Sequence, residues 1–86
     1  MSLQEFQQAQ RITQGFRRRP TDEELLALYG WFKQAQFGDA AGGRPGFWDP
    51  KGRRKWDAWH RVRGTPAQEA RQKYVEYVKQ LQGRYA

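Results

Sequence analysis

Residues 21–37 read TDEELLALYGWFKQAQF and carry the clearest helical pattern of the chain. Apolar side chains recur there at intervals of three and four residues, which is the spacing of an amphipathic helix. These positions are Leu25, Leu28, Tyr29, Phe32 and Ala35. Thr21 and Glu24 have the spacing of a capping box, and Gly38 is a typical helix stop. The pattern therefore predicts an α-helix over residues 22–37.

Helix signals also precede and follow this segment. Ser2 and Glu5 repeat the capping-box spacing, and a third such box begins at Thr65. Asp49 before Pro50 combines a favourable N-cap residue with a proline at the first helical position. Together with the apolar periodicity of each segment, these signals predict further helices at residues 3–15, 50–63 and 66–84.

The chain gives no indication of strands, because no stretch alternates polar and apolar residues for long enough. Residues 38–49 contain four Gly and one Pro, so we expect them to form a loop. A chain of 86 residues suffices for one domain and is too short to enclose a large cavity. The sequence thus predicts a single all-α domain over residues 1–86, a four-helix bundle whose ligand would lie in a groove.

The formal net charge of +7 favours an anionic partner: a nucleic acid, a membrane surface or a phosphorylated small molecule. Residues 51–63 hold six basic side chains against one acid, so a nucleic-acid-binding module is an alternative. A solvated helix surface explains the same residues, and charge alone discriminates weakly. The absence of Cys, of a signal-like N-terminus and of a long apolar run predicts a soluble intracellular protein without stable membrane insertion.

Catalytic and metal sites need combinations of side chains that this chain lacks. His60 is the only histidine, Ser2 is the only serine, and there is no cysteine. A Ser-His-Asp triad and a zinc site are therefore close to excluded. We expect no enzyme activity, no metal and no cofactor.

One local cluster favours a ligand. Tyr29 and Lys33 are four residues apart and share a helix face, with Phe32 beside them. Such rings can stack on a nucleotide base while the ammonium group meets a phosphate. The same pattern also fits core aromatics with Lys33 extending past them, which is the commoner use of aromatic residues on helices.

Three blocks at fixed separations resemble the acyl-CoA-binding protein family, also called diazepam-binding inhibitors. They read LYGWFKQAQFGD at 28–39, RPG at 44–46 and KWDAW at 55–59. The resemblance extends over essentially the whole chain without an evident gap. It implies four helices in up-down-down-up order, with a long overhand loop at residues 38–49. It also implies non-catalytic binding of medium- to long-chain acyl-CoA and its transport through the cytosol. We further expect a monomer by default, with acyl-CoA-using enzymes as partners and without nucleic acid as a ligand.

The resemblance assigns roles to individual positions. The family residues that hold the ribose 3′-phosphate match Tyr29, Lys33 and Lys55. The ring that contacts the adenine matches Phe32, and a further CoA contact on the last helix matches Tyr74. Residues near the acyl groove match Ala9, Leu25 and Leu26. Positions near the CoA phosphates match Arg19 and Gln14.

The chain departs from the family pattern at some of these positions. Phe32 stands where Tyr is usual, which keeps the ring and loses a hydroxyl. Gln14 stands where many members have Lys, which removes one charge. Phe47, Trp48 and Pro50 make the overhand loop bulkier than usual. We expect these changes to affect affinity and chain preference more than the class of ligand.

Overall fold

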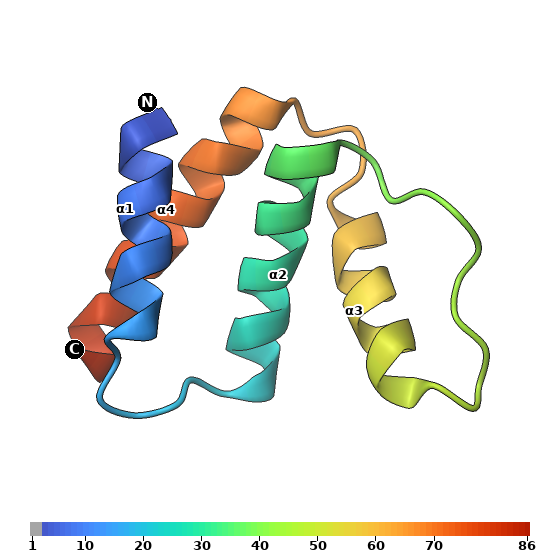
Figure 1. Cartoon of the computed structure of the whole chain (residues 1–86), viewed down its shortest axis with the longest axis horizontal. Helices are drawn as coiled ribbons and strands as arrows, with labels where there is room; N and C mark the ends of the chain where they lie inside the picture. The colour runs from blue at the N-terminus through green and yellow to red at the C-terminus, as the bar shows by residue number, and fades with distance from the viewer. Residues whose placement is uncertain (1–2) are drawn as a thin grey trace.

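The computed structural model describes residues 3–86, so the expected cap at Ser2 lies outside the described part of the chain. Within that part the secondary structure consists of four α-helices without strands. Their bounds are α1 Leu3–Gln14, α2 Asp22–Phe37, α3 Pro50–Arg61 and α4 Ala67–Tyr85. In Figure 1, α2 and α3 run in the same direction, and both α1 and α4 run antiparallel to them. This arrangement confirms the up-down-down-up bundle.

Two of the predicted helix starts are confirmed in detail. The Thr21 hydroxyl accepts the Glu24 backbone N–H at 3.1 Å, and the Thr21 N–H donates to the Glu24 carboxylate at 2.9 Å. This reciprocal pair is a complete capping box at the start of α2. At the start of α3, the Asp49 carboxylate accepts the Gly52 N–H at 3.0 Å, ahead of Pro50 in the first turn.

The capping box predicted at Thr65 is wrong. The N-cap of α4 is Pro66, and the structure has no side-chain hydrogen bond at this cap. Thr65 lies one residue too early to serve the first turn. Its N–H donates to the Val62 carbonyl, and its own carbonyl accepts the Gln34 side chain. Thr65 is therefore part of the α3–α4 turn and does not cap α4.

The hydrophobic core is built by three of the four helices. Its buried members come from α1, α2 and α4: Phe6, Ala9, Leu28, Ala35, Ala70, Tyr74, Val75, Val78 and Leu81. The single buried hydrophobic residue of α3 is Ala58, which lies outside this cluster. α3 consequently packs against α2 alone, on the side of α2 that faces away from α1 (Figure 1).

The close approach of α2 and α3 depends on a glycine in the middle of α2. A Cβ atom placed on Gly30 would lie 2.5 Å from the Ala58 carbonyl oxygen and 3.1 Å from its carbon. These are backbone atoms, which cannot move aside as a flexible side chain can. Gly30 therefore fixes the spacing of the two helices and, through it, the position of Tyr29 relative to α3.

A polar network holds the far end of α2 to the α3–α4 turn. Gln34, which is 1% exposed, donates to the Asp39 carboxylate at 2.8 Å and to the Thr65 carbonyl at 2.9 Å. Asp39 also accepts the Gly64 N–H at 2.7 Å, and these bonds lower the pKa of Asp39, with the Gly64 contribution the largest. The overhand loop thus leaves α2 from a fixed point.

Candidate functional site

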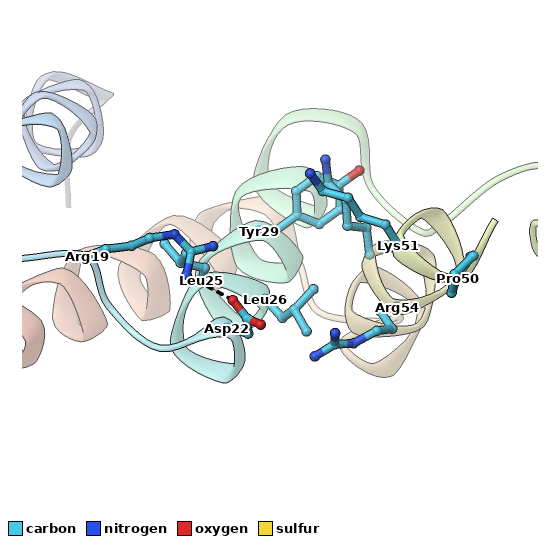
Figure 2. A pocket seen from close by; sticks show the side chains of 9 residues that line it. Arg19, Asp22, Leu25, Leu26, Tyr29, Pro50, Lys51 and Arg54 are labelled. Atoms are coloured by element: carbon cyan, nitrogen blue, oxygen red, sulfur yellow. Dashed lines mark hydrogen bonds and ion pairs between the residues drawn. The ribbon is translucent and has the colours of Figure 1, made fainter.

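An open cleft of about 560 Å³ lies between α2 and α3. One side presents the leucine side chains of α2, and the other presents basic side chains from the first turns of α3, as Figure 2 shows. Its lining residues are Arg19, Asp22, Leu25, Leu26, Tyr29, Pro50, Lys51, Arg54 and Lys55. A cleft of this size with an apolar wall and a cationic wall suits a ligand that has an apolar part and an anionic part.

The ring of Tyr29 brings two lysines from different helices close together. The Lys55 ammonium of α3 lies 4.8 Å from the centre of this ring, and the Lys33 ammonium of α2 lies 5.7 Å from it. Both distances are in the range of cation–π contacts. The predicted grouping of Tyr29, Lys33 and Lys55 around one ring is therefore present in the structure.

Lys33 differs from Lys55 in its surroundings. Its ammonium group also lies 4.5 Å from the Phe37 ring and 5.3 Å from the Trp59 ring, and it does not line the cleft. Trp59 is itself held by a 2.7 Å hydrogen bond from its indole N–H to the Gly38 carbonyl. Lys33 is thus positioned among three rings at the edge of the site, whereas Lys55 faces the cleft directly.

A second, smaller cavity of about 270 Å³ continues on the other side of α2. It shares Leu25 and Tyr29 with the cleft. Its remaining lining residues are Thr13, Phe16, Pro20, Leu28, Phe32 and Tyr74. Phe32 and Tyr74 lie 6.1 Å apart between ring centres, and burial raises the pKa of the Tyr74 hydroxyl. Two of the predicted site residues, Phe32 and Tyr74, therefore meet beside Tyr29 in a mainly aromatic setting.

The remaining predicted residues are more dispersed. Arg19, Leu25 and Leu26 line the cleft, and Arg19 forms a 3.0 Å ion pair with Asp22 at its rim. Ala9 is 2% exposed and belongs to the core, lining neither cavity. Gln14 ends α1 at an exposed position next to Thr13, and it too lines neither cavity.

The electrostatic balance of the cleft is positive. Four basic side chains line it against one carboxylate, and that carboxylate, Asp22, is already paired with Arg19. A nearby acid, Asp57, is bound by the Arg44 guanidinium through two hydrogen bonds of 2.8 and 2.7 Å, which lower the pKa of Asp57. With these acids occupied, the cleft concentrates positive potential and favours an anion.

The sequence model of the acyl-CoA-binding protein family matches residues 3–78, which include every side chain of the cleft. The chain belongs to the acyl-CoA-binding protein family. This is a family of binding proteins without catalytic activity, and its ligand is acyl-CoA.

Individual relatives agree with this membership. The acyl-CoA-binding protein homolog of Drosophila melanogaster is 38% identical over 86 residues, the full length of both chains. The crystal structure of Oryza sativa acyl-CoA-binding protein 2 has a TM-score of 0.89 at 38% identity, covering 94% of this chain and 88% of that one. The crystal structure of the family member from Moniliophthora perniciosa has a TM-score of 0.85 at 40% identity, covering 95% and 84%.

Metal and membrane features are absent from residues 3–86. No group of three or more His, Cys, Asp or Glu side chains lies there in an arrangement that could hold a metal ion. None of the helices in this range combines the length and the hydropathy that crossing a bilayer requires.

Three residues of the site are not assigned a place in it by the sequence patterns. Lys51 and Arg54 stand out only as members of a basic stretch, although Lys51, Arg54 and Lys55 have the spacing of one helix face. Gly30 interrupts no apolar position of the helical pattern, yet glycine in a helix interior costs about 1 kcal/mol relative to alanine. That cost is the available signal that a close packing contact requires it.

Proposed function

We propose that this protein binds medium- to long-chain acyl-CoA esters, and that it buffers and carries them through the cytosol as a monomer. The observation that supports this most is the Tyr29 ring with the Lys33 and Lys55 ammonium groups 5.7 and 4.8 Å from its centre, beside a cleft lined by leucines. A fatty acyl chain attached to a phosphorylated nucleotide has both of the chemical parts that this site favours.

The nucleotide end of the ligand is assigned to Tyr29 and the lysines. Lys55 donates to the ribose 3′-phosphate, with Lys33 supporting it from the edge of the same ring, and Phe32 and Tyr74 offer ring surface for the adenine. Arg19, Lys51 and Arg54 line the cleft and are available for the other phosphates. A charge-assisted hydrogen bond to a phosphate is worth about 1.5–3 kcal/mol. These contacts would therefore select CoA esters over free fatty acids.

The acyl chain is assigned to the apolar wall of the cleft, at Leu25 and Leu26. Burying one methylene group is worth about 0.8 kcal/mol, so a palmitoyl chain offers on the order of 10 kcal/mol. The chain would thus supply most of the affinity. An apolar wall of this kind has no use in binding the backbone of a nucleic acid, so the cleft favours the thioester over that alternative.

Isothermal titration calorimetry with palmitoyl-CoA, CoA and palmitate tests the proposal. We expect the intact thioester to bind more tightly than either fragment, because only the thioester contacts both the apolar and the cationic wall of the cleft. Equal affinity for palmitoyl-CoA and one of its fragments would contradict the assignment. A series of shorter and longer acyl-CoA esters then measures the chain preference.

A further inference from the structure

The overhand loop displays two large aromatic side chains away from the core. Phe47 is 79% exposed and Trp48 is 77% exposed, and their rings pack edge to face with centres 5.5 Å apart. We call this pair the aromatic tip. Figure 1 shows that the loop carrying it runs along the outer side of α3, away from the other three helices.

The aromatic tip is held in place by its local structure. The Asp49 N–H donates to the Gly46 carbonyl at 3.0 Å, which closes a turn around the two aromatics. The Trp48 ring lies against the Cα of Gly46, where any side chain at position 46 would collide with it. The stem of the loop is fixed to α3 by the Arg44–Asp57 ion pair of 2.7 Å. The exposure of the tip is therefore a property of an ordered turn.

Basic residues flank the aromatic tip in the sequence. Residues 44–55 contain five basic side chains and one acid, Asp49, whose carboxylate is used to cap α3. None of the salt bridges found in residues 3–86 involves Lys51, Arg53 or Arg54. Three cations outside these salt bridges thus follow the exposed aromatic rings directly in the chain.

We propose that the aromatic tip and these cations form a peripheral docking surface for an anionic phospholipid membrane. Tryptophan and phenylalanine partition into the headgroup region of a bilayer, and lysine and arginine are attracted to anionic lipids. Exposed rings on a loop can enter the headgroup region without a complementary groove, and the net charge of +7 matches an anionic surface. Pro50, which lines the cleft, is only two residues beyond Trp48 in the chain. Docking would therefore place this side of the cleft next to the bilayer.

The role of this surface in loading or releasing an acyl-CoA ester rests on the proposed function, but docking itself needs no ligand. The two ideas can therefore fail separately. Failure of acyl-CoA binding would appear in calorimetry without vesicles, whereas failure of docking would appear with ligand-free protein and vesicles.

Co-sedimentation of the ligand-free protein with vesicles tests the docking surface. The vesicles consist of phosphatidylcholine with or without phosphatidylserine. We expect binding to the phosphatidylserine vesicles that weakens as salt is added, and much weaker binding to phosphatidylcholine alone. The double substitution Phe47→Ser with Trp48→Ser should lower the partition coefficient by about tenfold or more, because it removes the apolar part of the surface.

A matched control uses Leu3→Ser, which changes another exposed apolar residue, 60% exposed, at the start of α1. We expect this variant to bind vesicles like the unchanged protein. Circular dichroism checks that the double variant keeps its helices, so that a loss of vesicle binding reports on the surface and not on the fold. Undiminished vesicle binding by the double variant would overturn the proposal, as would equal losses in the double variant and in Leu3→Ser. Absence of vesicle binding by the unchanged protein would also overturn it.

Discussion

At the scale of single residues, Tyr29 has two cationic neighbours with unequal access to the cleft. Lys55 lines the cleft, whereas Lys33 is surrounded by the rings of Tyr29, Phe37 and Trp59 and does not. We expect Lys55→Ala to weaken palmitoyl-CoA binding by about tenfold or more, which corresponds to one lost charge-assisted hydrogen bond. Lys33→Ala should have a smaller effect. Calorimetry measures both.

The control for this pair is Lys79→Ala, at an exposed position of α4. It removes the same charge without touching the cleft and should leave the affinity within twofold or so, since it changes only the long-range field. A loss in Lys79→Ala equal to that in Lys55→Ala would show that net charge, and not the position of Lys55, sets the affinity.

Glu24 is a second residue with a specific consequence, this time for stability. Its carboxylate, buried at the start of α2, accepts the Tyr85 hydroxyl and the Arg84 guanidinium, each at 2.6 Å. The Tyr85 hydroxyl contributes most, followed by the Thr21 backbone N–H, and together with Arg84 they lower the pKa of Glu24 from 4.5 to about 2. A folded-state pKa below the ordinary value means that ionised Glu24 stabilises the fold above about pH 4.5, and that this contribution is lost as the pH falls towards 2.

We therefore expect Glu24→Gln to lower the free energy of unfolding at neutral pH and to flatten its decline between pH 4.5 and 2. Tyr85→Phe removes the strongest of the donors and should have an effect in the same direction. Urea denaturation at a series of pH values measures both variants. Acid limbs that coincide with that of the unchanged protein would contradict this account.

At the scale of helices, Gly30 and Gly83 give opposite predictions for the same substitution. Gly30→Ala places a methyl group against the Ala58 backbone, so α2 and α3 must move apart. Overpacking costs about 1–3 kcal/mol, and contact with backbone atoms that cannot move aside places Gly30→Ala in the upper part of that range. The cost then exceeds the roughly 1 kcal/mol that alanine gains in a helix. Gly83 lies in α4 with open space around it, so Gly83→Ala should stabilise the protein by up to about 1 kcal/mol.

Thermal unfolding compares the two glycine variants directly, and calorimetry with palmitoyl-CoA adds a second readout. Gly30→Ala should lower both the melting temperature and the affinity, because the displaced helices carry Tyr29 and Lys55. Gly83→Ala should raise the melting temperature and leave the affinity unchanged. A rise in melting temperature for Gly30→Ala would show that the helices separate at no net cost.

The helices themselves could be predicted from the sequence because their signals are local. Apolar periodicity located α2, and the caps at Thr21 and Asp49 marked two starts. The prediction at Thr65 failed because α4 begins one residue later than the pattern suggests, with Pro66 as its N-cap. Close contacts such as Gly30 against Ala58 join residues far apart in the chain, so a periodic pattern cannot reveal them.

At the scale of the whole molecule, the core excludes α3. The buried cluster joins α1, α2 and α4, and α3 adds only Ala58 outside it. We expect hydrogen exchange in α3 and in residues 38–49 to be faster than in α4, because fewer buried contacts oppose local opening. Palmitoyl-CoA should slow exchange in α3 most, since the proposed ligand bridges α2 and α3.

Hydrogen exchange followed by mass spectrometry measures this difference peptide by peptide. α4 serves as the internal reference because Ala70, Val78 and Leu81 are fully buried. Equal protection of α3 and α4 in the ligand-free protein would contradict the view that α3 is peripheral.

The helix order and the ligand class followed from the resemblance to a family, and the residues alone left several anionic partners open. The grouping of Tyr29, Lys33 and Lys55 could be expected only through that resemblance, because Lys55 lies on a different helix from the other two. The aromatic setting of Lys33 and the burial of Ala9 depend on side-chain packing, which one-dimensional patterns do not contain.

The peripheral place of α3 separates two demands on the same small chain. Residues that keep the molecule folded gather in α1, α2 and α4, while half of the cleft is built by a helix that hardly contributes to that core. Substitutions in the first turns of α3 can thus change the ligand preference with little effect on the stability of the core. A chimera that exchanges residues 38–61 between relatives is consequently a direct way to change the ligand preference.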